Sequence, residues 1–193
     1  MDMSTLSTAD LVSELLSPDH RVHPAEALRA ADGESFYGPV LARDTLLDHK
    51  LGAARELILR DLRAKMRSGP VMGSPQTIHD WLRLYCADLE HEVFLALFLD
   101  ARQALIDVVQ LFRGTLTQTS VYPRELVKTA LALNAAAVVV AHNHPSGSAE
   151  PSRADEHLTQ TLKSALLMFD VRVLDHLIVT ASSVLSMAER GLV

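Results

Sequence analysis

Apolar residues recur at helical spacing through the first seventy residues of the chain. The segments LVSELL, PAEALRAA, TLLDHK and LGAARELILRDLRAKM each show this spacing, and short polar or glycine-containing breaks separate them. Such a period is typical of helices that bury one face. The glycines and prolines of SGPVMGSP (68–75) then predict a linker. We therefore expect a helical N-terminal region over residues 1–70 and a second domain over residues 71–193.

The second region predicts a helix and then two paired strands. TIHDWLRLYCADL (77–89) has the helical pattern. The dense apolar run EVFLALFLD (92–100) is typical of a buried strand. DARQ then predicts a turn, and ALIDVVQLFRG predicts the second strand of a hairpin.

The remaining segments alternate between strand and helix. TLTQTSVY (115–122) is β-branched and alternating, which predicts a third strand or an extended segment. PRELVKTALALN begins with Pro123 and ends with Asn134, as helices often do. AAAVVVAHNH predicts a buried strand, residues 152–169 a helix, and VRVLDHLIVT another strand. The fold class is therefore α/β with a mixed sheet.

Composition narrows the class of protein. Of 193 residues, 48% are hydrophobic and 22% are charged, as in a soluble globular protein, and the net charge of −6 weighs against a surface devoted to nucleic acid. A single cysteine excludes an intramolecular disulfide and fits a reducing compartment. The N-terminus lacks the pattern of a signal peptide, and the longest apolar run is shorter than the roughly 18–20 residues of a membrane span. We expect a cytoplasmic protein with no membrane partner.

Two histidines end one of the predicted buried strands. His142 and His144 lie two positions apart, so their side chains leave the same face of the strand. Pro145 and Gly147 then break the strand, which places the pair at its carboxyl end, where α/β folds often hold functional sites. By itself, His-Asn-His-Pro is better explained as a turn with two polar residues.

Asp155 lies in the helix that follows, beside its apolar stripe. A carboxylate there is costly unless it is paired, hydrogen-bonded or bound to metal. Ser152 and Asp155 also resemble a capping box, which by itself needs no metal. Two imidazoles and one carboxylate together make three zinc ligands, which leaves a fourth position for water, as in catalytic zinc sites. The stripe comprises Ala154, Leu158, Leu162, Ala165 and Phe169.

Glu92 is the candidate proton acceptor for such a water. It opens the first buried strand, in phase with Phe94 on one face, and can therefore point into the same cleft. The alternatives are that Glu92 is a solvated residue at the strand start, or that Glu90 takes the role.

The spacing of these residues resembles a known signature. His142-x-His144, seven residues, then Ser152-x-x-Asp155 matches the JAMM motif of JAB/MPN-domain metalloproteins. From about residue 70 to the end, the chain more narrowly resembles the RadC family, in the segments EVFLALFLD, GTLTQTSVYPRELVKTAL, AHNHPSGSAEPSRAD, VRVLDHLIVT and AERG. The resemblance implies an MPN (JAB1-like) fold, a curved mixed sheet flanked by helices and related in layout to the cytidine deaminases.

The resemblance also implies roles for individual residues. His142, His144 and Asp155 would bind Zn²⁺, Ser152 would hydrogen-bond the zinc water or the developing oxyanion, and Glu92 would act as the acid/base. The implied activity is that of a JAMM-type metallopeptidase, a zinc hydrolase that cleaves a peptide or isopeptide bond in a peptide or protein substrate. In VLDHLIVT, we expect Asp175 or His176 to have a hydrogen-bonded core role rather than that of a fourth ligand.

Two other functions stay open at this point. One is a DNA repair or recombination accessory protein, or a nuclease, that uses the same metal centre. The other is a binding scaffold without turnover. RadC relatives often carry a helix-hairpin-helix module that binds DNA, but DTLLDHKLGAARELI holds only Gly52, so this hairpin is degraded. Residues 43–67 hold seven lysines and arginines against four acids, a modest basic face that a solvated helix explains equally well.

Overall fold

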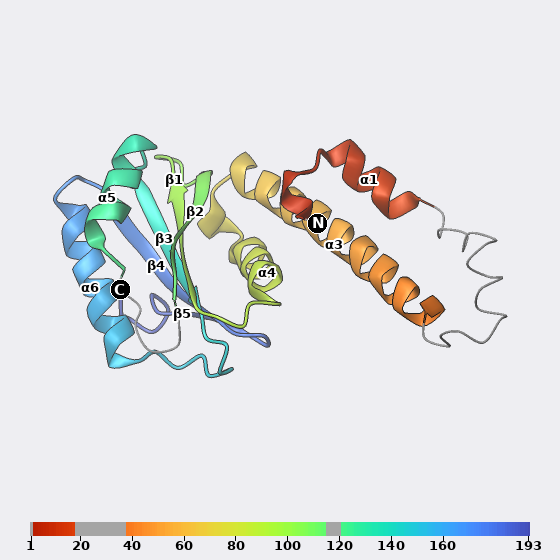
Figure 1. The fold of residues 1–193 in the computed structure, drawn as a ribbon. Helices are drawn as coiled ribbons and strands as arrows, with labels where there is room; N and C mark the ends of the chain where they lie inside the picture. The colour runs from red at the N-terminus through yellow and green to blue at the C-terminus, as the bar shows by residue number, and fades with distance from the viewer. Residues whose placement is uncertain (1, 18–37, 115–120) are drawn as a thin grey trace. The chain divides into compact units, whose positions relative to one another are not determined.

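The computed structural model describes residues 2–17, 38–114 and 121–193, without the side chains of 38–46 (Figure 1). The chain forms two compact units, Met1–Asp61 and Leu62–Val193. The division between them falls inside the long helix α3 (Gly38–Ser68). None of the described helices has the length and apolar character needed to cross a membrane.

In the described part of the first unit, a 3-10 turn and one helix accompany α3. The 3-10 turn η1 (Met3–Thr5) precedes α1 (Thr8–Leu16), which begins with a capping box at Ser7. Arg60 on α3 donates hydrogen bonds to the carbonyl oxygens of Ser4 and Leu6, at 3.2 and 2.7 Å. These bonds hold the N-terminal segment against the helix. The predicted helix PAEALRAA (24–31) lies outside the described residues.

The predicted break before LGAARELILRDLRAKM is wrong, because α3 runs through Gly52 without interruption. A Cβ atom at Gly52 would lie 3.4 Å from Cγ of Met3, which is a close contact. The Met3 side chain therefore packs on the helix at Gly52. No hairpin forms at this glycine.

The second unit is built on a five-stranded mixed sheet. Its strands are β1 (Val93–Leu99), β2 (Leu105–Arg113), β3 (Ala137–Asn143), β4 (Arg172–Val179) and β5 (Val184–Ser186), in the order β2-β1-β3-β4-β5. β3 and β4 pair in parallel, and the other neighbours are antiparallel. The predicted buried strand over 92–100 and its hairpin partner are both confirmed. Of TLTQTSVY, for which we predicted a strand or an extended segment, residues 115–120 lie outside the described residues. Tyr122 has an extended backbone but belongs to no strand.

Helices cover both faces of this sheet. α5 (Pro123–Ala132) and α6 (Arg153–Leu167) lie on one side, and α4 (Pro75–Cys86) lies on the other (Figure 1). The linker 68–75 contains a further 3-10 turn, η2 (Val71–Gly73). α4 begins at Pro75 and ends at Cys86. The helix predicted over 77–89 therefore began and ended too late in the chain. The expected α/β fold with a mixed sheet flanked by helices is confirmed.

The core beneath α5 and α6 fixes which face of α6 is buried. Thr159, Leu162 and Leu166 are fully buried, whereas Ala154 is exposed and Phe169 is 46% exposed. The buried face of α6 is therefore rotated about the helix axis from the apolar stripe that the sequence predicted. Asp155 lies one turn before Thr159, on the buried stripe itself. The core on this face of the sheet includes Phe94, Ala96, Phe98, Leu126, Ala130, Val138, Val140, Leu162 and Leu166.

Candidate metal centre

The two histidines lie where β3 ends. His142 is the penultimate residue of β3, and the backbone N–H of His144 donates to the carbonyl of Val179 at 2.8 Å, which extends the pairing with β4. Gly147 then turns the chain away with a φ of 85°, in the left-handed region that glycine adopts readily. The two Nε2 atoms lie 2.8 Å apart. The predicted same-face arrangement is thus present in the structure.

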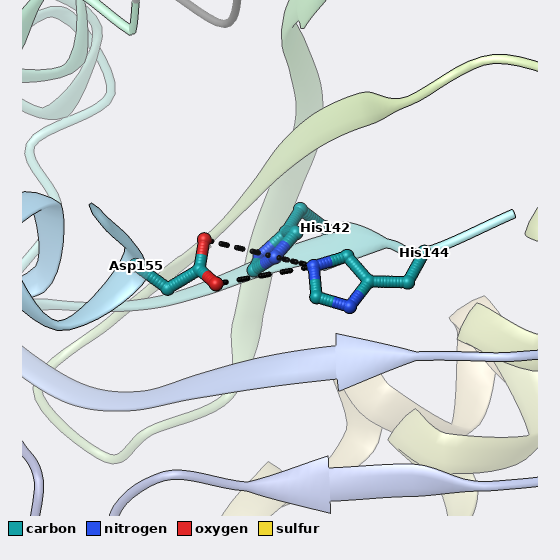
Figure 2. Close-up of side chains that lie close together, drawn as sticks. All are labelled: His142, His144 and Asp155. Atoms are coloured by element: carbon teal, nitrogen blue, oxygen red, sulfur yellow. Dashed lines mark hydrogen bonds and ion pairs between the residues drawn. The ribbon is translucent and has the colours of Figure 1, made fainter. Parts of the chain in front are cut away.

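Asp155 reaches the pair from the first turn of α6. Its Oδ1 lies 3.3 Å from Nε2 of His142, and its Oδ2 lies 3.9 Å from Nε2 of His144. Figure 2 shows the three side chains pointing toward one another, from a strand, a loop and a helix. One ligand atom from each lies within 4.8 Å of the other two. The three residues are therefore close enough to hold one metal ion.

Ser152 is the N-cap of α6. Its hydroxyl accepts a hydrogen bond from the Asp155 backbone N–H at 3.2 Å and donates one to Asp155 Oδ2 at 2.6 Å. The Ser152 backbone N–H also donates to Oδ2, which completes the capping box. Ser152 therefore starts the helix and orients the Asp155 carboxylate. Its predicted role toward a water or an oxyanion stays a prediction.

The charge state of Asp155 suits a metal ligand. Burial by itself would raise the pKa of this carboxyl. The close approach of Nε2 of His142 and the hydrogen bonds from Ser152 outweigh burial and hold the pKa of this carboxyl well below its usual range. The carboxyl is consequently ionised at neutral pH and available as an anionic ligand.

The chemistry of these donors fits a zinc ion. Nδ1 of His144 lies 2.7 Å from the carbonyl oxygen of Ser148, which can only accept, so Nδ1 carries the ring proton. Nε2 of His144 then presents a lone pair toward His142 and the Asp155 carboxylate. A cation among these atoms would satisfy all three groups at once. Imidazole nitrogen and carboxylate oxygen are both ordinary zinc ligands.

Glu92 lies beside the cluster without being part of it. Phe94 pairs with His142 across β1 and β3, so two more steps along this register place Glu92 opposite His144. Glu92 is partly buried. The group of possible metal ligands in the described residues does not include it. Its acid/base role therefore stays a prediction, and the register supports it.

Asn143, between the two histidines, holds the backbone around Glu92. Its Oδ1 accepts from the Val93 N–H at 2.7 Å, and its Nδ2 donates to the carbonyl of His91 at 3.0 Å. The Asn143 side chain is thus bonded to the residues immediately before and after Glu92. Sequence reasoning missed this role, although the place of Asn143 between two candidate ligands was a signal for it.

A third histidine lies buried behind the centre. His176 is fully buried on β4, and its Nε2 lies 2.8 Å from Nδ1 of His142. Burial is the main cause that lowers the pKa of His176, to about 3, with the charges of His142 and His144 acting in the same direction and that of Asp155 opposing them. His176 is therefore neutral at physiological pH. Its contact with His142 was also missed, because the irregular register between β3 and β4 hides it from sequence patterns.

Asp175 faces the opposite side of the sheet from His176. Its carboxylate accepts from the Ser186 hydroxyl at 2.6 Å, from the His176 N–H at 2.7 Å and from the Ala188 N–H at 3.0 Å. These bonds join β4 to β5 and to the turn after it. Both residues of the Asp175–His176 pair thus have hydrogen-bonded core positions, where we expected only one.

The chain is similar to known proteins along most of its length. Residues 72–192 match the family described as the RadC-like JAB domain. A UPF0758 protein of Leptothrix cholodnii is 62% identical over 143 residues, which cover 74% of this chain and 64% of that protein. A UPF0758 protein of Aromatoleum aromaticum is 54% identical over 187 residues, which cover 96% of this chain and 81% of that protein. The matched part of the chain thus spans less than two thirds of the Leptothrix relative.

Proposed function

Because the chain belongs to the family of RadC-like JAB domains, we propose that it is a zinc-dependent hydrolase of the JAMM metallopeptidase type. Its substrate would be a peptide or isopeptide bond. His142, His144 and Asp155 would hold the metal, Glu92 would act as the acid/base, and Ser152 would donate a hydrogen bond to the oxyanion. The observation that carries this proposal is the convergence of two imidazoles and one ionised carboxylate within 4.8 Å.

The metal ion would supply Lewis acidity, which lowers the pKa of a water molecule toward neutrality and polarises a carbonyl group. Glu92 accepts a proton from the attacking water at its carboxylate and donates it to the leaving amine. Asn143 holds the Glu92 backbone beside the cluster through its bonds to His91 and Val93. Asp155 keeps its orientation through the bond from the Ser152 backbone N–H, which remains when the Ser152 hydroxyl donates to the oxyanion.

The cations of α3 do not favour the nucleic-acid alternative. Lys50 donates to the Ser17 carbonyl, and Arg60 is bonded to the N-terminal segment. Arg63 and Arg67 both pair with Asp107 on β2. Arg55 and Lys65 also have interactions within the protein. The described lysines and arginines of this helix are therefore engaged in the protein, so peptide-bond hydrolysis is the function that we propose.

The proposal is tested by metal analysis followed by two activity assays in parallel. Wild type should bind zinc, whereas His144→Ala should lose it. With zinc supplied, the wild type should cleave peptide or isopeptide substrates and not DNA. Zinc-dependent nuclease activity without peptide-bond cleavage would overturn the proposed reaction. DNA affinity that falls steeply with salt would restore nucleic acid as a partner.

The assignment of the acid/base has a matched control in the chain. Glu92→Gln should retain zinc and lose hydrolysis by roughly 10²–10⁴-fold, the usual contribution of general acid–base catalysis. Glu90→Gln, two positions earlier, should retain both. Equal activity of Glu92→Gln and wild type would exclude Glu92 from the reaction.

A further inference from the structure

A chain of buried hydrogen bonds runs behind His142 and returns to Asp155. Nδ1 of His142 lies 2.8 Å from Nε2 of His176. Nδ1 of His176 lies 2.6 Å from the Thr159 hydroxyl, which in turn lies 2.6 Å from the backbone carbonyl of Asp155. The chain therefore joins two of the three proposed ligands through groups that do not touch the metal.

The direction of each hydrogen bond follows from its last acceptor. The carbonyl oxygen of Asp155 can only accept, so Thr159 donates its hydroxyl proton there. The Thr159 oxygen is then free to accept from His176, which places the His176 proton on Nδ1. Nε2 of His176 has no proton and accepts from Nδ1 of His142. The proton of His142 therefore lies on Nδ1.

We propose that His176 and Thr159 are positioning residues that hold His142 in its Nδ1–H form, with the Nε2 lone pair directed at the metal. The proposal deepens the proposed function and rests on its metal site. A hydrogen bond to the far nitrogen of a ligating histidine sets both the tautomer and the orientation of the ring. His144 receives the same support from the Ser148 carbonyl. Both imidazoles thus present Nε2 to the same point.

Burial makes this arrangement rigid. His176 and Thr159 are each fully buried, so water does not compete for their hydrogen bonds. Phe94 lies against both rings, stacked on His142 with 6.3 Å between centroids and edge-on to His176 at 5.7 Å. The His142 ring is consequently held by packing as well as by hydrogen bonding. Such support prepares a metal site before the ion binds.

The first test reads the tautomer of the full chain without metal. Nitrogen NMR at a pH where the imidazoles are neutral distinguishes Nδ1–H from Nε2–H histidine. The proposal predicts Nδ1–H for both His142 and His176. An Nε2–H signal for His142 would overturn it. Because no metal is needed, this result is independent of whether the proposed hydrolase function is correct.

The second test measures zinc affinity by competition with a chelating dye. His176→Phe removes the acceptor and should weaken zinc binding roughly 10–100-fold, as loss of a partner behind a metal ligand does in other proteins. His176→Gln, which keeps an acceptor oxygen, should restore much of the affinity. Thr159→Val should weaken binding, and Thr159→Ser should match wild type. His157→Gln, at an exposed histidine of α6, is the control and should also match wild type.

The outcomes distinguish the positioning role of His176 and Thr159 from the proposed zinc-dependent function. Zinc affinity in Thr159→Val and His176→Phe equal to wild type would overturn the positioning role while leaving the metal site intact. Equal weakening in Thr159→Ser and Thr159→Val would overturn it as well, because the hydroxyl would then be irrelevant. Absence of zinc binding in wild type would contradict the proposed function, and the tautomer measurement would still decide the hydrogen-bond chain. If His176→Phe does not fold, the NMR result on wild type still tests the proposal.

Discussion

The side-chain amide of Asn143 bridges the two peptide groups that flank Glu92. It accepts from the N–H of Val93 and donates to the carbonyl of His91, at 2.7 and 3.0 Å. A residue of β3 thereby extends the antiparallel pairing with β1 by side-chain bonds where backbone pairing ends. This one amide thereby links the backbone of Glu92, the candidate acid/base, to the segment that carries the candidate ligands His142 and His144.

Asn143→Ala should loosen the start of β1. The substitution leaves the Val93 N–H and the His91 carbonyl without these partners, and an unsatisfied buried group costs about 1–3 kcal/mol. We expect lower stability in chemical denaturation and faster amide hydrogen exchange at Val93. Asn143→Asp keeps the acceptor, so Val93 should stay protected in that variant. Equal protection of Val93 in wild type and Asn143→Ala would show that the bridge does not hold the strand.

Asp175 should be important for stability rather than for metal binding. Asp175→Ala removes the acceptor for the Ser186 hydroxyl and for the N–H groups of His176 and Ala188. We expect a loss of at least about 2 kcal/mol in free energy of unfolding, because buried donors are left unpaired. Asp175→Asn, which retains a carbonyl oxygen, should lose less. A fully stable Asp175→Ala protein would mean that β4 and β5 are held by other contacts.

His176 should make the metal-free protein sensitive to acid. Its folded-state pKa is lowered to about 3, below the unfolded value of about 6.5. The unfolded chain therefore binds a proton at a higher pH than the folded chain does. The stability contributed by the neutral ring is fully present above about pH 6.5 and is lost as the pH falls toward 3. Denaturation between pH 7 and pH 5 should show a steeper loss for wild type than for His176→Gln, and equal slopes would contradict this assignment.

Much of the fold follows from local patterns. The dense apolar runs of β1 and β3 and the proline at the start of α5 each predicted their element. The long helix α3 was wrongly divided, because glycine is also a helix breaker and the sequence does not show that Met3 packs on Gly52. The buried face of α6 was predicted wrongly because Thr159, which lies on that face, is a polar residue. Its hydroxyl is satisfied by His176 and by the Asp155 carbonyl, so it is buried at little cost.

The candidate site also has a part that the sequence predicts and a part that it does not. His142, His144 and Asp155 could be identified because a strand places alternate residues on one face and a short turn leads directly to the helix. The particular contacts of Asn143 and His176 could not be predicted, because they depend on which strands are neighbours. His176 comes from a strand 34 positions away in the chain, and an irregularity between β3 and β4 shifts the register. Pairing of this kind is set by the whole sheet rather than by local sequence.

The most direct test of the account is the zinc content of Asp155→Ala, measured by elemental analysis beside the neighbouring variant Glu156→Ala. Wild type and Glu156→Ala should each hold about one zinc ion per chain, as a site with three protein ligands does. Asp155→Ala should remain folded by circular dichroism and lose stoichiometric zinc, because the anionic ligand is gone. Full zinc content in Asp155→Ala would contradict the proposed metal centre.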